Sequence, residues 1–335
     1  MAIKRVLTLT ALFTCLAHIG GPTAARARAP RDAKIVFTSA PGPAAEIYVM
    51  NPDGGDLQQL TRLDAASVAA RWSPDGRRIV FSSTTRGAAG LLSLYVMKAD
   101  GSDITRLTDA RFASDCWPTW SPDGRTIAFA STWRPGAIGC HIYVVDAGGG
   151  NERRVTPDVP FNGTTCSAPS WSPDGSRIAF ASWNLDGSHI FTVGADGTGV
   201  RQLTAEGSNW SPSWSPDGTR IVFASSPHLI DPNTDICVMD PDGRNVVRLT
   251  DGPGRNRSPA WSPDGSMIVF DRFLRRGVGD IHIMDRDGRN ERRLTDSRDM
   301  NHTADWFDPA ALTVSPVGKR PDAWGWLKHL GASVR

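Results

Sequence analysis

Apolar residues in this chain fall into short stretches that are separated by turn-forming residues. One type of stretch has the pattern Ile-x-Phe followed by small residues, as in Ile79–Ser82 and Ile178–Ala181. A second type is rich in β-branched and aromatic residues, as in Ile142–Val145. Both types have the composition of β-strands, and neither has the length or the 3.6-residue period of an amphipathic helix. The pattern therefore predicts an all-β fold.

A turn motif precedes most of the Ile-x-Phe stretches. The string Trp-Ser-Pro-Asp-Gly occurs five times, beginning at Trp72, Trp120, Trp171, Trp214 and Trp261. Proline presets φ at the second turn position, and glycine accepts the left-handed conformation at the turn exit. The motif predicts a hairpin between a tryptophan-containing strand and the Ile-x-Phe strand. Later Asp-Gly turns predict the next hairpin.

The motif marks a repeated structural unit. Successive copies lie 48, 51, 43 and 47 residues apart, and a Leu-Thr or Val-Thr pair closes each unit. We expect every unit to be a four-stranded antiparallel meander. Four strands at a period of roughly 40–50 residues are typical of a β-propeller blade. Because the tryptophans occupy the same place in every unit, we expect them to pack between blades rather than to bind a ligand.

The two ends of the repeat region are incomplete in complementary ways. The first unit begins at Lys34–Ser39 without a tryptophan strand, whereas Ala304–Pro309 looks like a tryptophan strand with nothing regular after it. Together they complete one more unit, which predicts a six-bladed β-propeller. We expect the ring to close by pairing of the N- and C-terminal strands, Thr303–Phe307 with Ile35–Ser39, because this pairing covers two exposed strand edges.

The segments outside the repeats have separate roles. Lys4 and Arg5 precede an apolar stretch over Val6–Ile19, and small residues follow, so residues 1–27 are expected to be a signal peptide. The alternative is an uncleaved membrane anchor, although a spanning helix needs about 20 apolar residues. The propeller is assigned to residues 28–309. The tail, residues 310–335, is expected to contain a short helix over Asp322–Leu330 that packs on the propeller as a cap or as a docking peptide.

Charge and motifs narrow the possible functions. The net charge is +2, and the arginines are scattered, so nothing points to nucleic acid or to an anionic membrane surface. The sequence lacks a Gly-x-Ser-x-Gly nucleophile elbow, a phosphate-binding loop and a His-Glu-x-x-His motif. These features favour a non-catalytic protein over an enzyme, located in the periplasm or secreted and without membrane insertion.

The order of the repeated elements resembles a known family. Trp-Ser-Pro-Asp-Gly, Ile-x-Phe, a stretch such as Ile142–Val145, Asp-Gly and Leu-Thr follow one another as in TolB-like β-propellers, over residues 34–309. The resemblance implies a periplasmic protein that binds partners of the Tol–Pal system, including the peptidoglycan-associated lipoprotein. TolB also carries an N-terminal α/β domain, which we expect to be missing here. Similar repeats occur in prolyl-oligopeptidase-like peptidases and in a lyase that acts on pectin fragments.

Binding is expected where the units differ from one another. The residues four and five positions before each repeat tryptophan start the innermost strands, around one mouth of the central channel. Unequal side chains at equivalent positions suit a binding site for one ligand. The predicted binding residues are Asp115, Asn209, Trp210, Asn256, Arg257, Asn301 and His302, together with His228 from a connecting loop.

Other residues of this face leave alternatives open. Trp133 and Trp183 lie in connections that open on the same face, where they are candidate anchors for a partner or cover a neighbouring blade. His228 and His302 could suggest a metal, but no metal site and no cofactor is predicted. Calcium or another divalent metal in the channel stays open.

The cysteines predict limited cross-linking. Cys116, Cys140 and Cys166 are expected toward the same face in neighbouring units, so one disulfide among them is predicted, with the pairing left open. Cys237 falls within a strand and is expected to be a buried free thiol.

Two functions follow from these features. The first is an exported, monomeric binding or scaffold protein that holds an envelope protein or a small ligand at the channel mouth. The second is an enzyme, a lyase or hydrolase acting on oligosaccharides or peptides, with His228, His302, Arg257 and Asp115 on one face.

Overall fold

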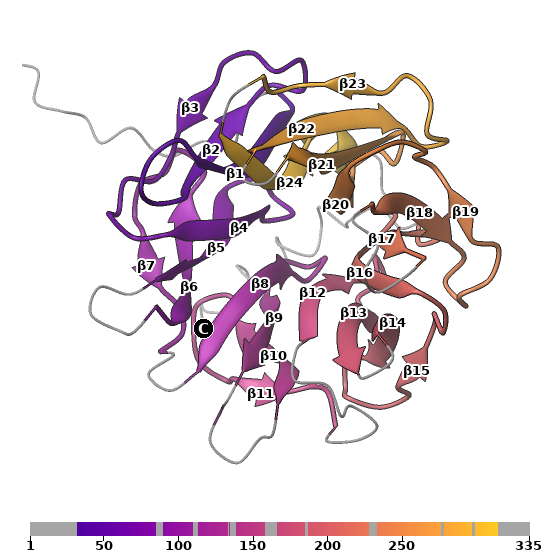
Figure 1. Ribbon diagram of the computed structural model, residues 1–335. Helices are drawn as coiled ribbons and strands as arrows, with labels where there is room; N and C mark the ends of the chain where they lie inside the picture. Colours follow the sequence, from indigo (N-terminus) through magenta and orange to yellow (C-terminus); the bar gives the residue numbers. More distant parts are fainter. Residues whose placement is uncertain are drawn as a thin grey trace, which may run out of the picture.

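Short β-strands make up almost all of the regular structure in the part of the chain that the structure describes (Figure 1). The computed structural model describes residues 32–84, 90–109, 113–132, 134, 139–157, 166–184, 187–227, 233–275, 278–296 and 299–313. The predicted signal peptide and the predicted helix of the tail lie outside these residues. Within them, the tryptophan stretch, the Ile-x-Phe stretch and the second β-branched stretch each form a strand, and a two-residue strand follows.

In the described segments, four sheets contain four antiparallel strands each. The first is β4 (Ser67–Trp72), β5 (Arg78–Thr84), β6 (Leu92–Lys98) and β7 (Thr105–Arg106). The second is β8 (Ser114–Trp120), β9 (Thr126–Thr132), β10 (Cys140–Asp146) and β11 (Arg153–Arg154). The third is β12 (Cys166–Trp171), β13 (Arg177–Asn184), β14 (Gly187–Gly194) and β15 (Arg201–Gln202). The fourth is β16 (Ser208–Trp214), β17 (Ile221–Ser226), β18 (Asp235–Met239) and β19 (Val247–Arg248).

An eight-stranded sheet holds both ends of the repeat region. One half is β20 (Arg255–Trp261), β21 (Met267–Arg275), β22 (Val278–Asp285) and β23 (Arg292–Arg293). The other half is β24 (Met300–Phe307), β1 (Lys34–Ala40), β2 (Glu46–Met50) and β3 (Gln58–Gln59). Among the described residues, a single parallel bridge between Gly279 and Met300 joins the halves. A 3₁₀ helix, η1 (Pro309–Thr313), follows β24.

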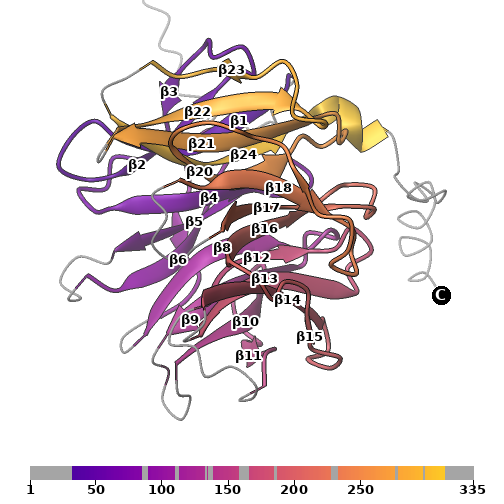
Figure 2. The same ribbon diagram turned by 45° about the vertical axis from the view of Figure 1, so that its right-hand side comes forward.

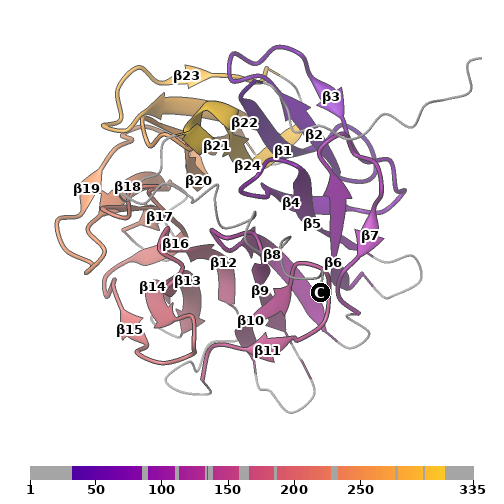
Figure 3. The same ribbon diagram turned by 180° about the vertical axis from the view of Figure 1, so that it is seen from behind.

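The sheets are arranged radially around a common axis (Figures 1 and 3). Strands β4, β8, β12, β16, β20 and β24 lie nearest the axis, and the two-residue strands lie at the rim. Figure 2 shows η1 at the edge of the molecule after β24. The sequence-based expectation of an all-β fold built from four-stranded antiparallel units is confirmed.

The repeated Ser-Pro-Asp-Gly turn is held by its own side chains. In the first copy, the Ser73 hydroxyl donates to Asp75 Oδ1 at 2.6 Å and accepts the Arg78 backbone N–H at 2.9 Å. Gly76 has φ = 64°, in the left-handed region that favours glycine. The same serine–aspartate bond recurs in the other four copies, so the sequence motif fixes one turn geometry throughout.

Repeated aromatic residues form the core. The phenylalanines of the Ile-x-Phe strands are all at most 1% exposed; they are Phe37, Phe81, Phe129, Phe180, Phe223 and Phe270. The repeat tryptophans reach toward a neighbouring sheet, and the indole N–H groups of Trp120 and Trp261 donate to the carbonyls of Arg71 and Ser213, both at 3.2 Å. This packing supports the structural role predicted for the tryptophans.

Each innermost strand carries a β-bulge at the same place, three residues before its repeat tryptophan. The residue there has a positive φ of 48–57° although it is never glycine; these residues are Ala69, Trp117, Ala168, Ser211, Ser258 and Thr303. Register shifts occur at the same points of the strand pairs. A bulge bends the strand and redirects the adjacent side chains, and non-glycine residues in this conformation are strained.

Candidate functional site

A pocket of about 820 Å³ opens between the third and fourth sheets and the eight-stranded sheet. Its walls combine aromatic, apolar and charged side chains. The lining residues are Trp117, Ser167, Ala181, Trp183, Ser188, Trp210, Ser211, Asn233, Pro253, Gly254, Arg255, Arg257, Ser258, Asp271, Phe273, Leu274, Met300, His302 and Thr303. This volume is in the range of sites that hold drug-sized ligands.

The bulges determine which residues reach the pocket. The side chains just before the bulge line it on four strands, through Ser167, Trp210, Arg257 and His302. Bulge residues also contribute, because Trp117, Ser211, Ser258 and Thr303 belong to the lining. The strained bulge therefore presents two consecutive side chains at the channel mouth, where a regular strand would present alternate ones.

Arg257 and Asp271 form the charged part of the pocket. They are direct cross-strand neighbours in β20 and β21. Arg257 is half-buried, its guanidinium carbon lies 5.6 Å from the centre of the Phe273 ring, and its Nε has no hydrogen-bond partner. Burial lowers the pKa of Arg257, although the charge of Asp271 opposes this shift. The guanidinium thus keeps unused donors beside an aromatic surface.

Asp271 is a buried carboxyl behind this arginine. Its exposure is 1%, and Oδ1 accepts the backbone N–H of Thr303 at 3.1 Å. Oδ2 makes no hydrogen bond, while the nearby Ser258 hydroxyl and the charges of Arg257 and Arg71 favour the carboxylate. Burial outweighs them and raises the pKa of Asp271 to about 7. The carboxyl is therefore poised to change charge near neutral pH.

His302 stands beside this pair as a neutral group. Its Nδ1 lies 2.7 Å from the Thr303 hydroxyl. Burial, together with the Arg257 charge, lowers the pKa of His302 to about 4. The imidazole is consequently uncharged at neutral pH and adds hydrogen-bonding capacity without charge.

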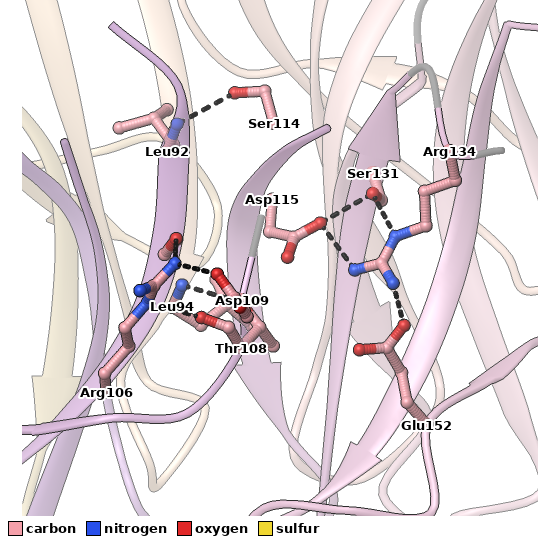
Figure 4. A network of polar contacts seen from close by, with 11 residues as sticks. Leu92, Leu94, Arg106, Thr108, Asp109, Ser114, Asp115, Ser131, Arg134 and Glu152 are labelled. Atoms are coloured by element: carbon pink, nitrogen blue, oxygen red, sulfur yellow. Dashed lines mark hydrogen bonds and ion pairs between the residues drawn. The ribbon is translucent and has the colours of Figure 1, made fainter. Parts of the chain in front are cut away.

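Asp115, in contrast, differs from the expectation that it faces the mouth. It is fully buried within the second sheet, where Oδ1 accepts from Ser131 Oγ at 2.6 Å and from Arg134 Nη2 at 2.8 Å (Figure 4). Arg134 also pairs with Glu152 and stacks over Tyr143. Side chains alternate between the two faces of a strand, so the side chain five residues before the tryptophan is turned away from the mouth.

The three asparagines at the same position follow the same rule, which corrects their predicted place in the mouth. Asn209 donates to the carbonyl of Glu206 at 2.7 Å, and Asn256 donates to that of Thr234 at 2.8 Å. Asn301 is 2% exposed. Buried amides with backbone partners stabilise the inner strands, so the sequence-predicted set is reduced to Trp210, Arg257 and His302 at the pocket.

Asp271 itself was missed in the sequence, although a signal was present. The residue after the repeated phenylalanine is small or neutral in every other unit: Thr38, Ser82, Ala130, Ala181 and Ala224. Asp271 is the acidic departure from that series. Departures from the repeat thus mark the pocket on the Ile-x-Phe strand as well as on the tryptophan strand.

The cysteines and histidines are placed as follows. Cys140 and Cys166 form a disulfide between the second and third sheets, with Cα atoms 5.2 Å apart. Cys116 and Cys237 are free, and burial raises their thiol pKa values to about 12 and about 11.

His228 and Trp133 lie outside the described residues. No group of three or more His, Cys, Asp or Glu in the described segments could hold a metal ion, and the prediction of a metal-free protein stays a prediction.

Radial four-stranded antiparallel sheets define a β-propeller. The family model described as the TolB beta propeller domain matches residues 158–228 and 205–314. A protein TolB homolog of Chlorobium luteolum is 46% identical over 57 residues, which are 17% of this chain and 13% of the relative. The Tol-Pal system protein TolB of Cereibacter sphaeroides is 38% identical over 79 residues, 22% of this chain and 17% of the relative.

The solved structures agree on the fold. The crystal structure of TolB from Acinetobacter baumannii superposes with a TM-score of 0.70 at 21% identity, covering 82% of this chain and 66% of that chain. The chain is therefore a TolB-like β-propeller. It spans less than a fifth of the length of the two curated relatives described above. No helix among the described residues is long and apolar enough to cross a membrane.

Proposed function

We propose that this chain is an exported, non-catalytic TolB-like binding protein that holds a partner protein of the cell envelope at the channel mouth. One observation carries the proposal: three exposed apolar side chains gather at the rim of the pocket. They are Trp183, Leu274 and Met300, which are 44%, 67% and 37% exposed. Exposed apolar side chains around a concave site are typical of protein interfaces, and tryptophan is a frequent anchor.

The first partner to test is a peptidoglycan-associated lipoprotein. A curated relative is a Tol-Pal system protein, and the repeat pattern of this chain resembles the propeller of that system. The probe that follows from the resemblance is therefore the peptidoglycan-associated lipoprotein of the organism that encodes this chain.

We further propose that the propeller has six blades and that its ring is closed within the eight-stranded sheet. The single bridge between Gly279 and Met300 supports a division of that sheet into two blades of four strands. Closure is supported by antiparallel pairing of β1 with β24, from Lys34 opposite Phe307 to Ala40 opposite Met300.

The location and the oligomeric state belong to the same proposal. A signal-like N-terminus favours export, and a disulfide is typical of proteins outside the cytoplasm. We propose a periplasmic or secreted protein that acts as a monomer, because closure leaves no long inner strand edge to pair with a second copy.

The test is a titration of purified lipoprotein into the mature protein and into two variants. Trp183→Ser/Leu274→Ser removes two of the three exposed apolar side chains at the rim of the pocket. Val246→Ser/Val247→Ser removes exposed apolar side chains from the outer part of the fourth sheet and is the matched control. We expect the rim variant to bind at least tenfold more weakly and the control to bind normally. Equal binding by all three proteins would place the interface elsewhere.

A further inference from the structure

Arg257 differs from Arg134 and Arg272, two other half-buried arginines, in lacking a carboxylate partner. Arg134 pairs with Asp115 and Glu152, and Arg272 pairs with Glu291. No ion pair or hydrogen bond joins Arg257 to Asp271 in the described structure, although the two residues are opposite each other. A cation that is withdrawn from water without a partner is unfavourable, and an anion bound in the pocket would compensate it.

The surroundings of Arg257 favour a flat ligand. The pocket is lined by the rings of Trp117, Trp183, Trp210 and Phe273, and Phe273 also packs against the guanidinium. Aromatic walls stabilise planar groups by stacking, while a guanidinium fork matches the two oxygens of a carboxylate. The volume of about 820 Å³ accommodates a ligand of small-molecule size.

Asp271 is positioned to control the strength of this site. Its structural task is to accept the Thr303 N–H at the bulge, and Thr38 performs the equivalent task for Ala69 N–H with an uncharged hydroxyl at 3.2 Å. A carboxyl is therefore not needed for that bond. What the carboxyl adds is a buried negative charge behind Arg257, which opposes the binding of an anion to it.

We propose that the pocket binds a small aromatic carboxylic acid, with the ring between the aromatic side chains, the carboxylate on Arg257 and the affinity set by Asp271. Asp271 is a positioning residue that acts through Arg257, since its carboxyl is almost completely buried, with 1% of the residue exposed. The charges that act on it are Arg257 on β20 and Arg71 on β4, and the titratable His302 on β24 lines the same pocket. Loss of a proton from Asp271 is expected to weaken binding of the acid.

This inference rests on the proposed function only in taking the channel mouth as a binding surface. The two can fail separately, because the partner protein is tested through the rim residues Trp183 and Leu274. The small acid is tested through Arg257 and Asp271, below the rim.

The experiment is calorimetric titration of the mature protein with indole-3-acetate, and with indole-3-acetamide as the uncharged match. The proteins compared are wild type, Arg257→Gln, Asp271→Thr, Asp271→Asn and the control Arg244→Gln, which alters an exposed arginine outside the pocket. Each variant is first checked for a native circular dichroism spectrum. Two different Asp271 variants keep the test valid if one does not fold.

Wild type is expected to bind the acid at least tenfold more tightly than the amide, and Arg257→Gln to lose at least tenfold in affinity for the acid. Arg244→Gln should change the affinity for the acid less than threefold. At pH 8 the Asp271 variants should bind the acid severalfold more tightly than wild type, and at pH 5.5 about equally. Equal binding of acid and amide, or unchanged binding by Arg257→Gln, would overturn the inference. Capture of the lipoprotein without any binding of indole-3-acetate would overturn it and leave the proposed function intact.

Discussion

Arg257 and Asp271 lie directly opposite each other in adjacent strands, yet their side chains make no hydrogen bond or ion pair in the described structure. Asp271 accepts the backbone N–H of Thr303 instead, and the guanidinium of Arg257 lies over the ring of Phe273. Because the two opposite charges are not paired, Arg257 stays available to a ligand in the pocket, while Asp271 stays buried. The titration of the buried Asp271 should appear in the pH dependence of the free energy of unfolding.

The first prediction concerns Asp271 and the free energy of unfolding. Between its ordinary value of 3.8 and the folded-state pKa of about 7, the folded protein holds a proton that the unfolded chain has lost. Stability therefore falls as pH rises through this window and levels off above it. Asp271→Thr should remove this loss, so that its stability relative to wild type increases by roughly 2–3 kcal/mol from pH 5 to pH 8. Urea unfolding at both pH values measures the difference, and parallel pH profiles would contradict it.

The second prediction concerns His302 and has the opposite sign. Its folded-state pKa of about 4 lies below the ordinary 6.5, because burial and Arg257 disfavour the imidazolium. The unfolded chain takes up the proton first, so stability is lost as pH falls from 6.5 toward 4. The loss is on the order of 3 kcal/mol at pH 4. His302→Gln should be less sensitive to acid than wild type in urea unfolding at pH 4.5 and pH 7. An unchanged difference between the two proteins would show that His302 titrates normally.

The sequence predicted the fold well because the fold depends on repeated local patterns. Turn residues, β-branched stretches and the phenylalanine series each point to the same strands. The site depends on departures from the repeat, and a departure does not reveal the direction of its side chain. Asp115 and Arg257 are both unusual residues at the start of an inner strand, but side-chain alternation buries Asp115, whereas Arg257, next to the bulge, lines the pocket. In each repeat unit these two positions are adjacent along the inner strand, and their side chains lie on opposite faces of it.

The third prediction concerns the disulfide between the second and third sheets. Cys140 and Cys166 are 26 residues apart, and closing such a loop stabilises a protein by about 3–4 kcal/mol through the unfolded chain. Cys140→Ala/Cys166→Ala should lose about this amount in urea unfolding under oxidising conditions. Reduced wild type should behave similarly. Cys116→Ala, which removes a free thiol, is the control and should show no loss of this origin. Equal stability of oxidised and reduced wild type would argue against the cross-link.

The fourth prediction tests the strain at the bulges. Ala69 has φ = 56° and is 4% exposed, whereas its neighbour Ala70 is fully buried with a negative φ. Glycine relieves the left-handed conformation at residue 69, but at residue 70 it only adds chain entropy to the unfolded state. Ala69→Gly should therefore be more stable than Ala70→Gly by roughly 1–2 kcal/mol, since both lose one buried methyl group. Thermal and urea unfolding of the two variants give the comparison, and equal stability would mean that the bulge is not strained.

The fifth prediction tests closure of the ring at one contact. The turn glycines Gly76 and Gly124 have φ values of 64° and 68°, so alanine is strained equally at both, by about 1 kcal/mol. A Cβ at Gly124 would lie 3.8 Å from Pro74, but a Cβ at Gly76 would lie only 2.1 Å from the ring of Phe307. Phe307 belongs to β24 and also packs on Trp72 with ring centres 5.5 Å apart.

Gly76→Ala should therefore cost roughly 1–3 kcal/mol more than Gly124→Ala in urea unfolding, because the ring of Phe307 must move. In a Phe307→Leu background the two alanine variants should become similar, since a smaller side chain leaves room for the methyl group. If Gly76→Ala and Gly124→Ala already cost the same in the wild-type background, β24 does not pack on the first turn and the proposed closure fails.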